Sequence, residues 1–74
     1  MLNQKIKKVI TIDGMVCDHC KTKVEKALLA LDGVTKVKIN LHDKTATIYS
    51  KNSIDEERII NVVEKLDYKV TNIG

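Results

Sequence analysis

The hydrophobic pattern of this chain switches between a two-residue and a helical period, and few small folds accommodate such switching. β-Branched residues are dense over residues 5–12, which predicts a strand that the Asp-Gly pair at 13–14 ends. From residue 20 to residue 31 the apolar positions recur at i, i+3, i+4 and i+7, which predicts one face of a helix. Gly33 then offers a residue for a left-handed C-terminal cap.

The middle of the chain predicts a hairpin followed by a second helix. Apolar and polar residues alternate over 36–41, a polar turn follows at 42–44, and residues 45–49 predict a third strand paired back on the second. Ser53 and Glu56 then form a Ser-x-x-Glu capping box, which predicts the start of the second helix.

The resulting order of elements is β-α-β-β-α-β, since Asp67 closes the second helix and residues 68–73 predict a last strand. This order favours an α+β, ferredoxin-like fold, a four-stranded antiparallel sheet with two helices on one face. We expect helices near 19–31 and 54–66, within one domain that spans residues 1–74. The residues predicted to be buried are Val24, Leu28, Leu31, Val37, Ile39, Ile59, Val63 and Leu66.

The composition limits the classes of partner. Thirteen Lys and Arg residues against ten Asp and Glu give a net charge of +3, which falls short of the basic patch typical of nucleic-acid-binding proteins. The predicted third strand carries one tyrosine and lacks the aromatic motif of RNA-recognition domains. We therefore expect no nucleic-acid partner.

The apolar segments are too short for a membrane span. The longest apolar run, residues 27–31, holds five residues, so we expect no insertion into a bilayer. The first fourteen residues lack the apolar core and cleavage site of a secretory signal. These features predict a cytoplasmic protein, whose free thiols are kept reduced.

Both cysteines of the chain, Cys17 and Cys20, stand at C-x-x-C spacing. Thioredoxin-like redox proteins share this spacing, but a chain without proline cannot supply the cis-proline that such folds place opposite the pair. A closed zinc site needs four ligands, and only His19 and His42 could add to the two thiols. Two thiolates suit a soft ion such as Cu(I), with the sulfurs roughly 4 to 5 Å apart for bonds of about 2.2 to 2.3 Å.

The position of the cysteines also predicts their reactivity. They stand in a loop and in the first turn of the predicted helix, where amide groups and the helix dipole favour anions. Thiol pKa values at helix N-termini tend to fall, which makes thiolate available near neutral pH. No base or nucleophile pair accompanies the thiols, so we expect no enzymatic activity.

At these residues the chain resembles the heavy-metal-associated domain family, whose signature Gly-Met-x-Cys-x-x-Cys stands here at residues 14–20. The segments "LDGVTKVKINL" (31–41) and "VEKLDYKV" (63–70) are similar to the family's second strand and to its closing helix and strand. Within the family, the chain is similar to bacterial CopZ-type copper chaperones, which carry Cu(I) in the cytoplasm.

The resemblance implies a role for each residue of the motif. Cys17 and Cys20 become the Cu(I) ligands, and Met15 points into the core and supports the loop, although its thioether is also a soft ligand. Tyr68 matches a tyrosine near the metal, or it closes the core. His19 is an exposed bystander, a modulator of thiol acidity, or a third ligand in a copper-bridged dimer. Asp67 departs from the glycine that many relatives carry before this tyrosine.

The resemblance also implies partners. The recipients in the family are the N-terminal metal-binding domains of copper-exporting P-type ATPases and copper-responsive repressors, and the carrier is a monomer, with a copper-bridged dimer as the alternative. Two other readings stay open. The domain could bind another thiophilic ion, Hg(II) or Zn(II), or it could be an excised N-terminal domain of a P-type ATPase.

Overall fold

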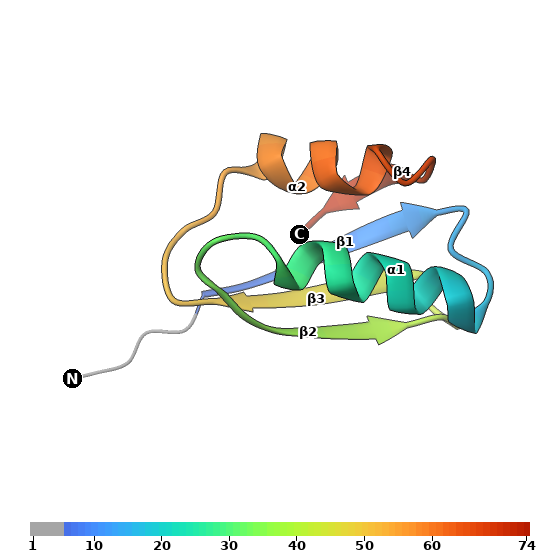
Figure 1. Ribbon diagram of the computed structural model, residues 1–74, viewed down its shortest axis with the longest axis horizontal. Coiled ribbons are helices and arrows are strands. Elements are labelled where there is room, and N and C mark those ends of the chain that lie inside the picture. Colours follow the sequence, from blue (N-terminus) through green and yellow to red (C-terminus); the bar gives the residue numbers. More distant parts are fainter. Residues whose placement is uncertain (1–5) are drawn as a thin grey trace.

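The computed structural model describes residues 6–74, and its elements follow the predicted order, β-α-β-β-α-β. The strands form one antiparallel sheet in the spatial order β2-β3-β1-β4, and the two helices lie over the same face of it (Figure 1). The ferredoxin-like fold class is thereby confirmed. The elements are β1 (Ile6–Asp13), α1 (Asp18–Leu29), β2 (Val34–Asn40), β3 (Thr45–Ser50), α2 (Glu56–Glu64) and β4 (Lys69–Ile73). Lys5, the predicted start of the first strand, lies outside the described residues.

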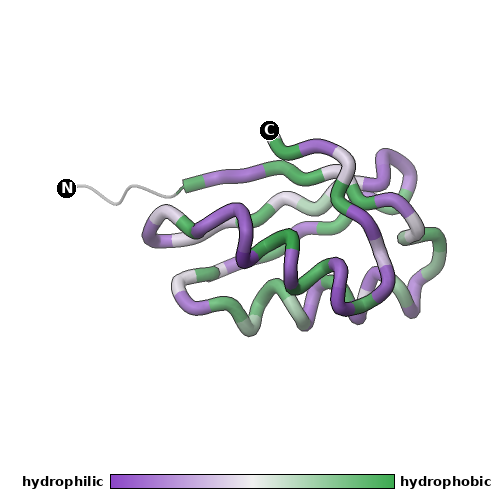
Figure 2. The backbone as a smooth tube through the Cα atoms, turned by 90° about the horizontal axis from the view of Figure 1, so that it is seen from above, coloured by the Kyte–Doolittle hydropathy of each residue, from purple (hydrophilic) through white to green (hydrophobic). Residues whose placement is uncertain are grey.

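The core lies between the helices and one face of the sheet. Alternate residues of the central strands point toward the helices, so hydrophobic and hydrophilic segments alternate along the backbone (Figure 2). Of the residues predicted to be buried, Val24, Leu28, Val37, Ile59 and Val63 are confirmed.

The prediction of full burial was wrong for Leu31, Ile39 and Leu66, which are half-buried and pack against the rim of the core. Leu31 and Leu66 follow the last residues of their helices, and Ile39 lies on the edge strand β2. Other helices and strands therefore cover these three side chains less completely than they cover a residue in the centre of the core.

Helix α1 ends earlier than predicted, at Leu29 with Ala30 as its C-cap. The amide of Leu31 donates to the carbonyl of Leu28 at 3.1 Å, a tighter i-to-i−3 bond that closes the last turn. Gly33 does adopt a left-handed φ of +92°, but it lies beyond the position that caps the helix. It turns the chain into β2 instead.

Helix α2 begins at Glu56 with Asp55 as its N-cap, so the predicted capping box of Ser53 and Glu56 was wrong. The Asp55 carboxylate accepts a hydrogen bond from the amide of Glu57 at 3.2 Å. This register puts Ile59 of the buried core and Ile54, which is half-buried against that core, at the spacing of a hydrophobic staple. Packing of these two side chains favours Asp55 over Ser53 as the N-cap.

This corrected cap can be tested by mutation. Asp55→Ala should lower the free energy of unfolding by about 1 kcal/mol, because it leaves an amide of the first turn without its partner. Ser53→Ala is the matched control and should change the free energy by less than about 0.5 kcal/mol, since Ser53 is exposed. Urea denaturation measures both. If Ser53→Ala lowered the free energy of unfolding more than Asp55→Ala did, Ser53 would be the N-cap, as the capping box predicts.

Within residues 6–74, no helix has both the length and the apolar character needed to cross a bilayer.

Candidate metal centre

The two cysteines lie at one end of the sheet, where β1 leads into α1. Gly14 follows the end of β1 with a φ of +100°, a left-handed conformation that glycine adopts without strain. The side chain of Met15 is fully buried in the core. Val16, the next residue, is 72% exposed. Met15 therefore anchors a loop whose following residues face outward.

Cys17 is the N-cap of α1, and Cys20 lies in its first turn. The Cys17 sulfur accepts a hydrogen bond from the amide of Cys20 at 3.4 Å, in the role that a serine or aspartate oxygen commonly fills. Cys17 is exposed and Cys20 is half-buried, and both are free cysteines. The helix N-terminus thus holds one thiol at its rim and one just inside it.

The two sulfurs are 2.9 Å apart and share a hydrogen bond. This separation is shorter than the roughly 4 to 5 Å predicted for a two-coordinate ion between two sulfurs. Binding of a two-coordinate ion would therefore require the two sulfurs to move apart. Rotation of the exposed Cys17 side chain could open the pair without disturbing the buried part of the loop.

The surroundings of Cys20 favour its thiolate form. Hydrogen bonds from the Cys17 thiol and the Tyr68 hydroxyl, helped by the backbone amides of Val16 and Cys17, outweigh the opposing effect of burial and together lower the pKa of Cys20 to about 7. The hydrogen bond that the Tyr68 hydroxyl donates to Cys20, together with burial and the nearby negative charges, raises the pKa of Tyr68 to about 12. Tyr68 therefore stays protonated and donates to the sulfur.

Tyr68 reaches the site because the loop before β4 turns sharply. Asp67 has a left-handed φ of +69°, where the resemblance noted above would place a glycine. The Tyr68 ring packs against Gly14, so closely that a Cβ at Gly14 would lie 3.1 Å from Tyr68 Cδ1. The absence of a side chain at Gly14 is thus needed for the tyrosine to approach the cysteine loop.

We expect Tyr68→Phe to raise the pKa of Cys20. Phenylalanine keeps the ring but removes the hydroxyl donor, so the neutral thiol gains relative to the thiolate. The thiolate population at pH 7 should fall, and it can be followed by the ultraviolet absorbance of thiolate during a pH titration. Tyr49→Phe, a change on β3, is the control and should leave the titration unchanged. If the thiol titration of Tyr68→Phe matched that of the wild-type protein, the Tyr68 hydroxyl would not act on Cys20.

Other polar residues lie at the same end of the sheet as the cysteines. His19 is exposed in the first turn of α1, and Lys69 is exposed at the start of β4. His42 lies exposed in the hairpin turn. Among residues 6–74, no group of three or more His, Cys, Asp or Glu side chains is placed to hold one metal ion.

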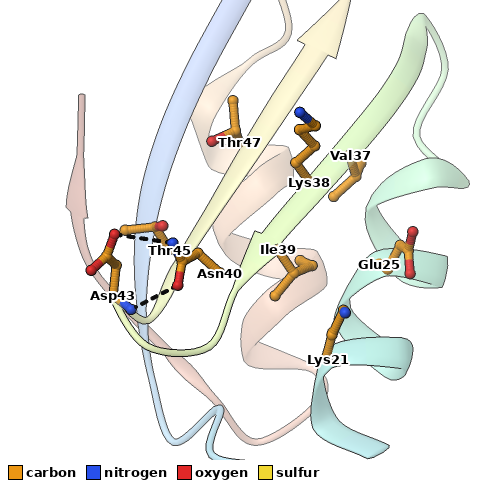
Figure 3. Close-up of a pocket in the computed structure, with 9 residues that line it drawn as sticks. All are labelled: Lys21, Glu25, Val37, Lys38, Ile39, Asn40, Asp43, Thr45 and Thr47. Atoms are coloured by element: carbon orange, nitrogen blue, oxygen red, sulfur yellow. Dashed lines mark hydrogen bonds between the residues drawn. The ribbon is translucent and has the colours of Figure 1, made fainter. Parts of the chain in front are cut away.

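Lys21 is half-buried and faces a different feature, a groove of about 590 Å³ beside the edge strand β2. Figure 3 shows Lys21 and Glu25 projecting from α1 toward Val37 and Ile39 of β2. Neither cysteine lines this groove, so the groove is separate from the thiol pair.

Sequence reasoning missed two contributions to the site. The Cys17 sulfur acts as a helix cap, and backbone amides in the loop help to lower the pKa of Cys20. N-caps are predicted from Ser, Thr, Asp and Asn, so a cysteine in that role is not recognised from the sequence. Amides of the helix N-terminus were expected to favour the thiolates, but the residue types did not indicate the contribution of the loop amides of Val16 and Cys17.

Comparisons with known proteins agree with this geometry. The sequence profile of the heavy-metal-associated domain matches residues 4–69. The copper chaperone CopZ of Staphylococcus haemolyticus is 38% identical over 66 residues, which cover 88% of this chain and 97% of the relative. A solved structure of a CopZ metallochaperone superposes with a TM-score of 0.82 at 30% identity, covering 89% of this chain and 100% of that one.

A larger protein shares the same unit. A probable copper-exporting P-type ATPase of Archaeoglobus fulgidus is 35% identical over 68 residues, which cover 90% of this chain but 8% of the ATPase. The match of the family profile, together with high coverage by relatives above 30% identity, leaves one assignment. The chain belongs to the heavy-metal-associated domain family.

Proposed function

We propose that this protein is a cytoplasmic copper chaperone that binds Cu(I) through the Cys17 and Cys20 thiolates. The observation that carries the proposal is the pairing of two free, accessible thiols at a helix N-terminus. Thiolates select soft ions over hard cations, and Cu(I) is satisfied by two of them. The CopZ relatives are named as copper chaperones, which supports copper over Hg(II) or Zn(II).

Binding begins from a protein that is partly prepared for it. A thiol must lose its proton to become a ligand, so affinity rises as the thiolate population rises. With the pKa of Cys20 lowered to about 7, this cysteine is close to half ionised at neutral pH and can make the first bond. Cys17, at the exposed rim, then swings to the opposite side of the ion. The Tyr68 hydroxyl and the helix amides offset the negative charge of the two sulfurs.

We propose that the protein releases Cu(I) by ligand exchange and carries out no catalytic reaction. Free dissociation would break both thiolate bonds, whereas an incoming thiolate of a recipient can attack the open ion first. A three-coordinate species forms, and one original thiolate then leaves. The recipient that fits is the metal-binding domain of a copper-exporting P-type ATPase, because such an ATPase contains a stretch similar to this chain. A copper-responsive repressor is a second candidate recipient.

The same arrangement bears on the oligomeric state. Two-thiolate coordination is complete within one chain, so we propose a monomeric carrier. A copper-bridged dimer would need a third ligand from the same or the partner chain, and His19 is the exposed side chain next to the thiols that could supply one. Sedimentation at increasing Cu(I) loading would distinguish the two.

Transfer to a recipient domain tests the proposal, and Lys21→Glu is its most informative variant. If Lys21 steers the approach to an acidic recipient, the charge reversal should slow transfer severalfold at low salt and weaken its salt dependence. The Cu(I) affinity should stay almost unchanged, because Lys21 is no ligand. Stopped-flow transfer rates at several recipient concentrations provide the measurement.

Lys51→Glu is the matched control, since Lys51 is exposed just beyond β3, at the opposite end of the sheet from the cysteines. Transfer rates that respond equally to both charge reversals would rule out steering by Lys21. Rates that do not depend on recipient concentration would show that copper dissociates first, which would rule out ligand exchange.

A further inference from the structure

The net charge of the chain is concentrated on the sheet face that the helices leave open. Strand register places four lysines on this face, and the carboxylate among its strand residues is Asp13, opposite Lys69. Asp43 of the hairpin turn accepts a hydrogen bond from Asn40 at one end of the face. The strand residues of the face carry a formal charge of +3, which equals the net charge of the whole chain. The other nine basic and nine acidic residues of the sequence cancel. The four lysines are Lys7, Lys36, Lys38 and Lys69.

Three of these lysines surround a tyrosine of β3, a strand with neighbours on both sides, near the end of the sheet away from the cysteines. Lys7 of β1 and Lys36 of β2 both lie opposite Tyr49 of β3, one on each side. Lys38 lies opposite Thr47 and thus diagonal to Tyr49. All three lysines are exposed, and Tyr49 is half-buried. With neighbouring strands about 4.8 Å apart, the backbones of Lys7 and Lys36 are separated by about 10 Å.

We propose that this face, Lys7, Lys36 and Lys38 around Tyr49, docks reversibly on an anionic lipid bilayer. A bilayer offers a continuous negative surface, so all three ammonium groups can approach it together. Tyrosine is enriched where membranes meet water, because its ring is apolar and its hydroxyl is polar. The few charges and the single aromatic side chain make the attachment weak and transient.

A bilayer fits these residues better than a single-stranded nucleic acid does. Nucleic-acid platforms stack successive bases on several aromatic side chains, and this face offers one tyrosine within the described residues. The lysines also spread over two strands on both sides of Tyr49, whereas a phosphate backbone follows a narrow track.

Docking by this face would leave the thiol pair free. The cysteine loop lies beyond the end of β1, at one end of the sheet and not on the open face (Figure 1). The usefulness of such docking rests on the proposed function, since a carrier held near a bilayer would meet a membrane-embedded recipient more often. The docking itself needs no metal.

Sedimentation with lipid vesicles tests the proposal on the metal-free protein at low salt. The protein should bind vesicles of phosphatidylcholine mixed with phosphatidylglycerol and should ignore vesicles of phosphatidylcholine alone. Each lysine near an anionic surface contributes about fivefold to partitioning, so the double variant Lys36→Gln, Lys38→Gln should bind about 25-fold more weakly. Added salt should abolish binding of the wild-type protein.

The matched control is Lys23→Gln, Lys26→Gln, which removes the same charge from exposed positions of α1. It should weaken binding by no more than a few-fold. Equal losses in the two double variants, or no binding to the anionic vesicles, would overturn the proposal. Tighter, Lys36- and Lys38-dependent binding to a single-stranded oligonucleotide or to polyglutamate would overturn the choice of a bilayer.

Cys17→Ser, Cys20→Ser separates this proposal from the copper site. This double variant should bind anionic vesicles as the wild-type protein does. If the protein failed to bind copper, the vesicle result would still stand. If it failed to bind vesicles, the copper site would still stand.

Discussion

Cys17→Ser and Cys20→Ser should each remove tight Cu(I) binding. One thiolate cannot complete a two-coordinate site, and a serine hydroxyl is a hard, neutral ligand that Cu(I) does not favour. Replacing an outer-shell partner of a metal site costs about 10- to 100-fold in affinity, and the loss of a ligand should exceed this range. Competition with a strong Cu(I) chelator under reducing conditions measures the effect.

Both serine variants should keep their fold. Cys17 is exposed and caps α1, and serine is among the preferred N-cap residues, so this substitution should leave the free energy of unfolding unchanged or slightly raised. Urea denaturation checks this point and ensures that lost binding is not lost structure. Wild-type affinity in either single variant would exclude the paired-thiolate site.

His19→Ala is the companion to these variants. Because His19 is exposed and lies between the two proposed ligands in the sequence, we expect its removal to change Cu(I) affinity by a few-fold at most. A loss as large as that of the cysteine variants would make His19 a ligand.

Of all these variants, Met15→Ala should lower the free energy of unfolding the most. The Met15 side chain is fully buried, and truncation of a buried methionine to alanine costs about 2 to 5 kcal/mol. A chain of 74 residues has a total free energy of unfolding of roughly 4 to 11 kcal/mol, so this loss is a large fraction of the whole. Urea denaturation should show a much lower midpoint, with loosening of the cysteine loop that Met15 anchors.

Met15→Leu distinguishes support of the loop from metal ligation. Leucine nearly conserves the volume, so the free energy of unfolding should fall by less than about 1.5 kcal/mol. If Met15 acts only through packing, Cu(I) affinity should remain near that of the wild-type protein. A large loss of Cu(I) affinity in a stable Met15→Leu protein would identify the thioether as a ligand.

The order of elements and the fold class were predictable from hydrophobic periodicity. Val24 and Leu28 of α1, and Ile59 and Val63 of α2, recur at helical spacing and are fully buried. Boundaries were less predictable. The sequence predicted that a capping box of Ser53 and Glu56 starts α2, whereas Asp55 is the N-cap. This choice accompanies the packing of Ile54 and Ile59 at the core, which capping preferences alone do not contain.

The candidate site was predictable in its residues but not in its geometry. The C-x-x-C spacing identified the thiol pair, but it did not predict the hydrogen bond that brings the two sulfurs to 2.9 Å. The approach of Tyr68 depends on the left-handed turn at Asp67 and on the space left by Gly14. The lysine face was hidden for a related reason, because Lys7 and Lys36 are brought to either side of Tyr49 only by strand register.

X-ray absorption by the copper-loaded, reduced protein is the most direct test of the central claim. We predict one Cu(I) per chain with two sulfur neighbours at about 2.2 to 2.3 Å and no nearby nitrogen or oxygen. Zn(II) added in competition should not displace the ion. Three or more ligands in a monomeric protein, a nitrogen neighbour, or displacement of Cu(I) by Zn(II) would contradict the account.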